Sequence, residues 1–269
     1  MILSCSTITW GELKDINEFD RALASIRAMG YSDVGIEFPL LSPSLQRDLA
    51  RSGGAPKRAG LTVSAVAIDA SPEMAKIVRE FGSSVGWLCL FETDIESAIE
   101  KTKKLSGASA KAGVDVALHP HVRSSIETTE DLDRIMKACA PNRTSVCVDP
   151  AHLTGLDIDV PKFIERYKGS ISLVHFKDLR SKKPQQEIDY ATDFVDLGEG
   201  VADLKGTLMA LRAIGYSGAV MVEVDYPQKG VVEVSARKNY DFLVSIAGPA
   251  GRRTPARRPS PAGIQTRRR

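Results

Sequence analysis

Short apolar runs and longer amphipathic runs alternate along most of this chain. The short runs are rich in β-branched residues, as in buried strands, and the longer runs place apolar residues three and four positions apart, as in helices. The predicted strands are Ile2–Ser6, Asp33–Glu37, Thr62–Ala67, Val85–Leu90, Val114–Leu118, Thr144–Asp149, Ser172–Lys177 and Gly218–Val224. The predicted helices include Ile16–Met29, Asp94–Ala112, Thr129–Cys139 and Asp203–Ile214.

Eight strands that are each followed by a helical or irregular crossover predict an α/β fold. The expected architecture is a (β/α)8 TIM barrel that forms a single domain over residues 1–247. A doubly wound open sheet is the alternative, but it would need a glycine-rich phosphate-binding turn, and neither GxGxxG nor GxxxxGK[ST] occurs. The segment Leu40–Gly60 fits the repeat least well, because it holds two prolines and three glycines.

The composition is that of an ordinary globular protein, with 43% apolar and 26% charged residues. No apolar run approaches the roughly 20 residues that span a bilayer, so no membrane partner is expected. The N-terminus lacks the basic start and long apolar stretch of a secretory signal. Four cysteines without CxxC spacing predict buried free thiols in a reducing compartment. We therefore expect a cytoplasmic protein.

The net charge of +2 combines two unlike parts of the chain. Residues 249–269 contain seven arginines and no acid. Since those seven charges exceed the total by five, the other 248 residues carry a net charge of −5. The Arg/Pro-rich segment 248–269 has too little apolar content to fold, so we predict a disordered tail there. The acidic balance of the barrel argues against nucleic acid as its partner.

All four histidines lie between residues 119 and 175, at or just past the ends of predicted strands. His119 and His121 follow the fifth strand, His152 follows the sixth, and His175 lies in the seventh. Charged residues occupy equivalent strand ends: Glu37, Asp149, Lys177, Glu223 and Asp225. In a TIM barrel the chemistry takes place at the carboxyl ends of the strands, and imidazole is the commonest metal ligand. The pattern predicts a metal centre or an acid–base site.

Four motifs resemble those of the xylose isomerase-like TIM barrels, the sugar phosphate isomerase/epimerase family. They are Val146-Cys-Val-Asp-Pro-Ala-His-Leu-Thr-Gly-Leu-Asp, Val174-His-Phe-Lys-Asp, Asp196-Leu-Gly-Glu-Gly-Val and Gly215-Tyr-Ser-Gly-Ala-Val-Met-Val-Glu-Val-Asp. The resemblance extends from Ile2 to about Ile246. Each motif alone is of moderate specificity, and their order along the chain makes the combination strong.

The resemblance implies one divalent cation, held by Glu, Asp, His and Glu at four strand ends. Three of these positions match Asp149, His175 and Glu223, and the fourth falls on His119. Either His119 is itself the ligand, which we favour, or Glu127 reaches in from the following loop. If His119 binds, Glu127 joins the catalytic residues. Two carboxylates and two imidazoles suit Mn²⁺, Zn²⁺, Fe²⁺ or Co²⁺ better than Mg²⁺ or Ca²⁺, and Mn²⁺ is our first choice.

The remaining residues of the predicted site receive roles in catalysis or substrate binding. His121 occupies a position that in related barrels often carries an acid–base residue, so it is the candidate general base; the alternative is a hydrogen bond to a neighbouring carboxylate. His152 is expected to support the site or bind substrate rather than to ligate. The other candidates for substrate binding are Glu37, Lys177, Trp10 and Glu199. For Lys177 a surface pair with Asp178 is the alternative, and for Trp10 packing at the barrel mouth.

The resemblance implies proton abstraction beside a carbonyl, with metal charge stabilising the enediolate. We expect first an isomerase or epimerase of a small sugar, sugar phosphate or keto-polyol. The second reading is a metal-dependent lyase, either an inosose- or dehydroshikimate-type dehydratase or a keto sugar acid decarboxylase. A non-catalytic carbohydrate-binding barrel ranks third, and a DNA-repair nuclease would need more histidines. A homo-oligomer stays open as the common state of soluble assemblies.

Overall fold

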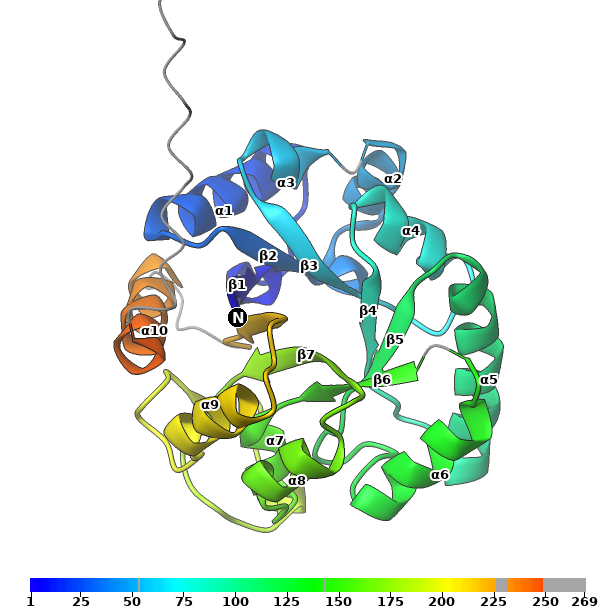
Figure 1. The fold of residues 1–269 in the computed structure, drawn as a ribbon. Coiled ribbons are helices and arrows are strands. Elements are labelled where there is room, and N and C mark those ends of the chain that lie inside the picture. Colours follow the sequence, from blue (N-terminus) through cyan, green and yellow to red (C-terminus); the bar gives the residue numbers. More distant parts are fainter. Residues whose placement is uncertain (53, 143, 226–231, 249–269) are drawn as a thin grey trace, which may run out of the picture.

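The structure is a computed structural model that describes residues 1–52, 54–142, 144–225 and 232–248. Eight parallel strands form a closed barrel in the order β1-β10-β7-β6-β5-β4-β3-β2, and helices surround it (Figure 1). The barrel strands are β1 Ile2–Ser6, β2 Asp33–Ile36, β3 Thr62–Ala67, β4 Val85–Leu88, β5 Asp115–Leu118, β6 Thr144–Val148, β7 Ile171–Phe176 and β10 Ala219–Val222. The predicted TIM barrel is confirmed.

Helices follow the barrel strands and pack around the outside (Figure 1). The α-helices are α1 Ile16–Met29, α2 Pro43–Ser52, α3 Ala55–Arg58, α4 Met74–Glu80, α5 Ile95–Lys111, α6 Thr129–Cys139, α7 Pro150–Gly155, α8 Val160–Arg166, α9 Leu204–Ala213 and α10 Val232–Ala247. The described residues also contain three short 3-10 helices, η1 Thr7–Trp10, η2 Phe38–Leu40 and η3 Gln185–Glu187. The poorly patterned segment Leu40–Gly60 thus contains α2 and α3, and Pro43 is the first residue of α2, where its missing N–H has no cost.

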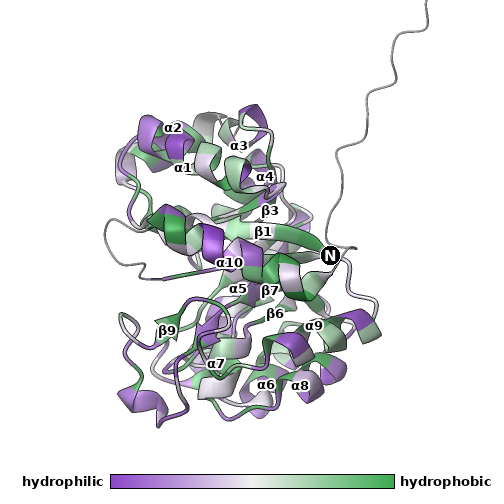
Figure 2. Cartoon of the chain, turned by 90° about the vertical axis from the view of Figure 1, so that its left-hand side faces the viewer, coloured by the Kyte–Doolittle hydropathy of each residue, from purple (hydrophilic) through white to green (hydrophobic). Residues whose placement is uncertain are grey.

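Apolar side chains fill the space on both sides of the strands. The larger cluster lies between strands and helices, and a second one inside the barrel combines small residues with Trp87, Leu173 and Met221. Gly35 shows how closely the interior packs, because a Cβ there would lie 1.8 Å from Met221 Sδ. The view from the side shows apolar colour along β1 and polar colour over much of α2 (Figure 2). The barrel is therefore a packed core, and its chemistry is confined to the mouth.

The eighth barrel strand is shorter than the sequence predicts. It ends at Val222 rather than Val224, so Glu223 and Asp225 lie just past the strand end, at the mouth. Two further strands of two residues each were not predicted, β8 Asp178–Leu179 and β9 Phe194–Val195. They pair antiparallel in a separate sheet between β7 and α9. Two residues are too few to produce a strand periodicity in the sequence.

The segment between β7 and α9 is held by one buried carboxylate. Asp178 Oδ1 accepts hydrogen bonds from the amides of Leu179 and Ala202, and Oδ2 accepts from those of Gly198 and Gly200, all at 2.9–3.0 Å. Gly200 permits this close approach, since a Cβ there would lie 2.3 Å from Asp178 Oδ1. Asp178 is only 1% exposed, so the predicted alternative of a surface Lys177–Asp178 pair is wrong.

Two further predictions concern membrane-spanning helices and the C-terminal tail. No helix in the described residues is long and apolar enough to cross a membrane. The predicted tail 248–269 lies outside the described residues except for Gly248. Gly248 follows α10 directly and has a φ of 66°, a left-handed backbone typical of glycine at a helix end.

Replacing Asp178 with Asn should destabilise the protein, because the amide group would face backbone N–H donors that now bind a carboxylate. We expect the free energy of unfolding to fall by about 2–4 kcal/mol. Urea unfolding measures this loss. Asp157→Asn is the matched control: Asp157 is 89% exposed, so a change within about 0.5 kcal/mol is expected. Equal stability of the two variants would contradict the role given to Asp178.

Candidate metal centre and active site

The register of the barrel brings the predicted site residues together at the carboxyl ends of the strands. Leu88 pairs with Leu118 across β4 and β5, and Val222 pairs with Phe176 across β10 and β7. The residues that come next on these strands therefore lie side by side: Cys89 beside His119, and Lys177 beside Glu223. Because all eight strands run parallel, these neighbours form one ring of polar groups above the packed interior.

Asp149 directly follows β6 and is fully buried. Its Oδ1 caps α7 by accepting hydrogen bonds from the amides of Ala151 (2.9 Å) and His152 (3.1 Å). Its Oδ2 lies 3.2 Å from His119 Nε2. Burial alone would raise the pKa of Asp149, but the hydrogen bond from His119 and the charge of Lys177 outweigh it, and the pKa is lowered. Asp149 is therefore an ionised carboxylate whose second oxygen faces the imidazoles.

His175 and Glu223 form the other half of the ring. His175 Nδ1 lies 3.1 Å from Glu223 Oε2. Neither atom makes a hydrogen bond within the described residues, and His175 Nε2 also has no partner there. Burial, followed by the charge of His119, lowers the pKa of His175 well below its usual range, so the imidazole is neutral. Two buried atoms that can bind a metal ion thus lie next to each other, and neither has a hydrogen-bond partner within the described residues.

This arrangement fits a divalent cation. Ligand bonds of about 2.0–2.2 Å place two ligand atoms of one ion roughly 3–3.5 Å apart, which agrees with the His119–Asp149 and His175–Glu223 distances. The rings of His119 and His175 have centroids 4.6 Å apart, so the two halves adjoin. In each of two groups, the potential ligand atoms all lie within 4.8 Å of one another: His119, Cys147 and His175 form the first group, and His119, Asp149 and His152 the second. Glu223 is in neither group and joins the site through His175. His119 belongs to both groups.

Glu127, the alternative ligand, lies away from these donors. Its Oε2 accepts a hydrogen bond from Gln185 Nε2 at 2.7 Å, in the segment between β8 and β9. No hydrogen bond or ion pair within the described residues joins Glu127 to His119, Asp149 or His175. The structure brings His119, rather than Glu127, to the cluster. It also adds Cys147 as a potential donor, which the sequence had suggested only as a buried thiol.

Lys177 supplies the positive charge of the site. Its Nζ lies 2.8 Å from both Glu223 Oε1 and Asp225 Oδ2, and 3.5 Å from His152 Nε2. Burial would lower the pKa of Lys177, but Asp225 and Glu223 outweigh this effect and raise the pKa well above its ordinary value. Lys177 therefore stays charged and separates two carboxylates that would otherwise repel each other.

Glu37 follows β2 and faces the same group of charges. Burial, followed by the negative charge of Glu223, raises the pKa of Glu37 well above its usual range. Its Oε2 is sealed from solvent and has no hydrogen-bond partner among the described residues. Its backbone N–H donates to Thr7 Oγ1 at 2.9 Å, which fixes the chain at this point. The raised pKa favours the protonated form of Glu37, which can donate a proton.

His121 has a defined tautomer. Its Nδ1 donates a hydrogen bond to Val122 O at 2.9 Å and lies 3.3 Å from the Tyr190 hydroxyl, which itself donates to Val122 O at 2.9 Å. Nδ1 therefore carries the proton, and Nε2 holds the lone pair. Burial, followed by the positive charges of His119 and Lys177, lowers the pKa of His121 well below its usual range. A neutral imidazole with a free Nε2 lone pair can accept a proton.

Aromatic rings form a wall on this side of the mouth. His121 stacks on His152 with ring centroids 3.6 Å apart, and Phe194 lies 4.7 Å beyond His152. Phe91, which is 61% exposed, meets the other edge of His121 at 5.5 Å. Tyr190 stacks parallel to Phe194. The β8–β9 segment thus contributes apolar surface that the sequence analysis did not assign to the site.

Two predicted substrate-binding residues lie apart from the cluster. Trp10, in η1, packs against the main apolar core, and its Nε1 is sealed without a hydrogen-bond partner among the described residues. Glu199 is half exposed and pairs with Lys238 of α10. Within the described structure, no hydrogen bond, ion pair or aromatic ring contact joins either residue to the histidines or to Lys177. Their roles in substrate binding stay predictions.

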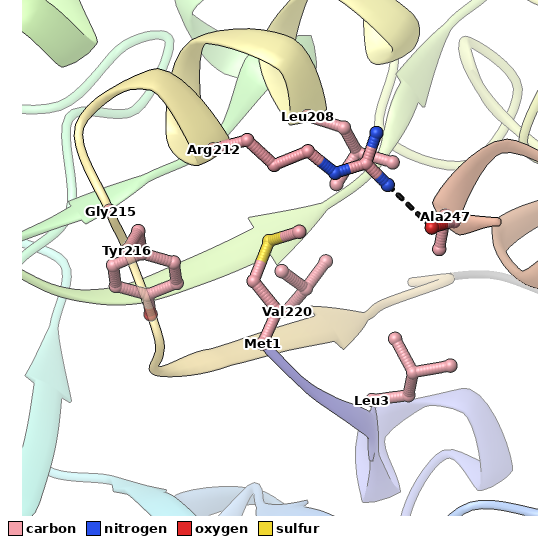
Figure 3. A pocket seen from close by; sticks show the side chains of 8 residues that line it. All are labelled: Met1, Leu3, Leu208, Arg212, Gly215, Tyr216, Val220 and Ala247. Carbon is pink, nitrogen blue, oxygen red and sulfur yellow. Dashed lines mark hydrogen bonds between the residues drawn. The ribbon is translucent and has the colours of Figure 1, made fainter. Parts of the chain in front are cut away.

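A cavity at the opposite end of the barrel has a different character (Figure 3). It has a volume of about 300 Å³ and is lined by Met1, Leu3, Leu208, Arg212, Gly215, Tyr216, Val220 and Ala247. Its one charged side chain, Arg212, donates a hydrogen bond to Ala247 O. Because the lining has no carboxylate, imidazole or thiol, it offers neither metal ligands nor acid–base groups. The candidate metal ligands and acid–base residues lie at the mouth, at the carboxyl ends of the strands.

The sequence places the chain in a known family. The family described as "Xylose isomerase-like TIM barrel" matches residues 13–245, so the chain belongs to the xylose isomerase-like TIM barrel family. Among curated proteins, the inosose dehydratase of Geobacillus thermodenitrificans is 29% identical over 143 residues, 50% of this chain and 48% of the relative. The inosose dehydratase of Lacticaseibacillus casei is 26% identical over 157 residues, 54% of this chain and 53% of the relative. The chain spans about half the length of these relatives.

Solved structures share the architecture. The IOLI protein with a bound zinc atom superimposes with a TM-score of 0.74 at 18% identity, covering 92% of this chain and 98% of that one. An L-ribulose 3-epimerase gives a TM-score of 0.75 at 17% identity, with 92% and 95% covered. Identity at this level establishes the fold alone. The names of the curated relatives favour the lyase expectation over the isomerase or epimerase that the sequence analysis ranked first.

Replacing Lys177 with Met would leave two buried carboxylates, Glu223 and Asp225, without their cation. We expect the free energy of unfolding of the metal-free protein to fall by about 3–5 kcal/mol near neutral pH. Burial already raises the pKa of Asp225 to about 6 with Lys177 in place, and the variant should raise it further. A raised folded-state pKa contributes stability that is present in acid and lost as the pH rises through it, so the deficit should shrink on acidification.

Urea unfolding at several pH values measures this deficit. Lys182→Met is the control, because it removes an exposed ion pair with Asp157, and such pairs contribute about 1 kcal/mol or less. A deficit in the Lys177 variant that stays constant between neutral pH and about pH 5 would contradict the electrostatic account.

Proposed function

We propose that this protein is a metal-dependent lyase that removes water from a cyclic polyol ketone of the inosose class. The structural observation that supports it best is a neutral base, His121, whose ring contacts that of His119, together with buried side-chain atoms of His175 and Glu223 that have no hydrogen-bond partner within the described residues. The curated relatives that cover half of the chain are named inosose dehydratases. Together, these point to proton abstraction next to a carbonyl, followed by loss of a hydroxyl group.

Four residues would hold the cation: His119, Asp149, His175 and Glu223. Two imidazoles and two carboxylates are a donor set for Mn²⁺, Zn²⁺, Fe²⁺ or Co²⁺. Because the IOLI protein, which has the same fold, binds a zinc atom, Zn²⁺ and Mn²⁺ are the two ions to test first. When bound, the ion would withdraw electron density from a substrate carbonyl and acidify the neighbouring C–H bond.

His121 would take the proton from the carbon beside the carbonyl. Its Nδ1 proton is bound to Val122 O, so Nε2 is the accepting atom. The positive charges of His119 and Lys177 keep the pKa of His121 low and the imidazole unprotonated before the reaction. Positioned proton transfer of this kind contributes about 10²–10⁴-fold to rate.

Glu37 would supply the proton that the leaving hydroxyl needs. Burial raises the pKa of Glu37 and keeps it protonated, in contrast to the lowered pKa of His121. Such divergent pairs assign acid and base within one site. The substrate loses a proton from carbon to His121 Nε2, the C–O bond of the adjacent hydroxyl breaks, and that hydroxyl leaves with the proton of Glu37 as water. A C=C bond forms beside the carbonyl.

Lys177, His152 and the aromatic wall would bind the substrate. The Lys177 ammonium can donate to a substrate oxygen while it keeps its two carboxylate partners. His152 Nδ1 is buried without a partner in the described structure and can bind a hydroxyl. The rings of His121, His152 and Phe194 offer an apolar face for the C–H side of a small carbohydrate. Epimerisation of a ketose would use the same base, and it is the second candidate.

Mass spectrometry separates these reactions, because dehydration removes the mass of one water and epimerisation conserves mass. We expect the Zn²⁺- or Mn²⁺-loaded protein to dehydrate an inosose, and His121→Gln to lower kcat by about 10²-fold or more. Tyr216→Phe is the control, since that hydroxyl bonds to Ala219 O near the opposite end of the barrel. Interconversion of ketoses without loss of water would replace the dehydratase by an epimerase. Failure to convert any keto-polyol would reject the substrate class.

A further inference from the structure

Cys89 and His119 occupy equivalent positions at the ends of neighbouring strands. Leu88 and Leu118 are paired in the β4–β5 register, and the amide of His119 donates to Leu88 O at 3.0 Å. The next side chains therefore lie side by side, and Cys89 Sγ is 3.1 Å from His119 Nδ1. Cys89 is free of any disulfide and partly exposed.

The two nitrogens of His119 face different partners. Nε2 faces Asp149 Oδ2, on the side where the proposed cation would lie, and Nδ1 faces Cys89 Sγ. Within the described residues, Cys89 Sγ is the one atom in hydrogen-bond contact with Nδ1. An imidazole that binds a metal through Nε2 carries its proton on Nδ1 and needs an acceptor there, which fixes both the tautomer and the ring orientation.

We propose that Cys89 is a positioning residue for His119, whose Nδ1–H donates to the Cys89 sulfur when Nε2 binds the cation. This inference rests on the proposed metal centre. Without a cation the ring is positively charged, so Nε2–H donates to Asp149 and Nδ1–H already faces the Cys89 sulfur. A cation at Nε2 would displace the Nε2 proton to solvent and leave the Nδ1–H bond to the sulfur in place.

Asp149 and His119 differ in what holds their side chains in place for metal binding. Asp149 has Oδ1 bound to two helix amides, so its orientation is fixed independently of the cation. On the side of its ring away from Asp149, His119 is held within the described residues by its contact with Cys89. The Cys89 sulfur thus orients the His119 ring in the way that the two backbone amides orient the Asp149 carboxylate. Partners of this kind typically contribute 10–100-fold to metal affinity.

The test is the Zn²⁺ dissociation constant, measured by competition with a chelating dye at fixed pH. Cys89→Ala removes the acceptor and should weaken Zn²⁺ binding by about 10–100-fold. Cys89→Ser replaces it with a hydroxyl oxygen that can also accept, so it should stay within about threefold of wild type. Cys139→Ala is the matched control, a buried free cysteine in α6, and should leave the constant unchanged.

A second readout separates positioning from general destabilisation. With Co²⁺ bound, the visible absorption spectrum reports ligand geometry; we expect it to change in Cys89→Ala and to be retained in Cys89→Ser. Thermal unfolding of the metal-free proteins should give similar midpoints for the two variants. Because Cys89 is partly exposed, truncation to Ala leaves no large cavity.

Three results would overturn the proposal or locate its failure. Wild-type Zn²⁺ affinity in Cys89→Ala would overturn it. Equal weakening in the Ala and Ser variants would also overturn it, because a hydroxyl can accept the same hydrogen bond. His119→Ala separates the role of His119 as a ligand from the role of Cys89. Full Zn²⁺ affinity in His119→Ala would reject His119 as a ligand. Lost affinity in His119→Ala together with wild-type affinity in Cys89→Ala would reject only the positioning role of Cys89.

Discussion

The buried carboxylate of Asp149 is the group around which the mouth of this barrel is organised. One oxygen accepts two amide hydrogen bonds at the start of α7, and the other lies 3.2 Å from His119. A buried charge with a single partner would be destabilising, so the protein surrounds it with imidazoles and with the Lys177 ammonium. Burial and the positive charges of His119 and Lys177 lower the pKa of His121, which favours a neutral base. Burial and the negative charge of Glu223 raise the pKa of Glu37, which favours a protonated acid in the same site.

The fold was accessible from the sequence because each barrel strand is a short apolar run between helical patterns. Strands such as Ile2–Ser6 and Thr62–Ala67 have the predicted bounds. The grouping of Asp149, His175, Glu223, Lys177 and His119 followed from the same reasoning, since parallel strands end on one rim. The motif order added the family, which the match over residues 13–245 confirms.

The rest of the site depends on contacts that periodicity does not encode. The β8–β9 segment has strands of two residues, so nothing in the sequence predicted that Tyr190 contacts His121 or that Phe194 contacts His152. The pairing of Cys89 with His119 follows from the β4–β5 register, which is fixed only when the barrel closes. The sequence offered Glu127 as an alternative metal ligand and Glu199 as a substrate-binding residue, and in the structure their carboxylates contact Gln185 and Lys238. A side chain on a short polar loop can point toward the site or away from it, and its direction depends on tertiary packing.

We propose that one divalent cation binds at the ring of potential ligands that includes Asp149 and His175. The zinc content of the purified, reconstituted protein tests this binding, compared among wild type, Asp149→Ala and His175→Ala, with Cys139→Ala as control. We expect about one ion per chain in wild type and control, and little or none in the two ligand variants. Full zinc content in both ligand variants would contradict it.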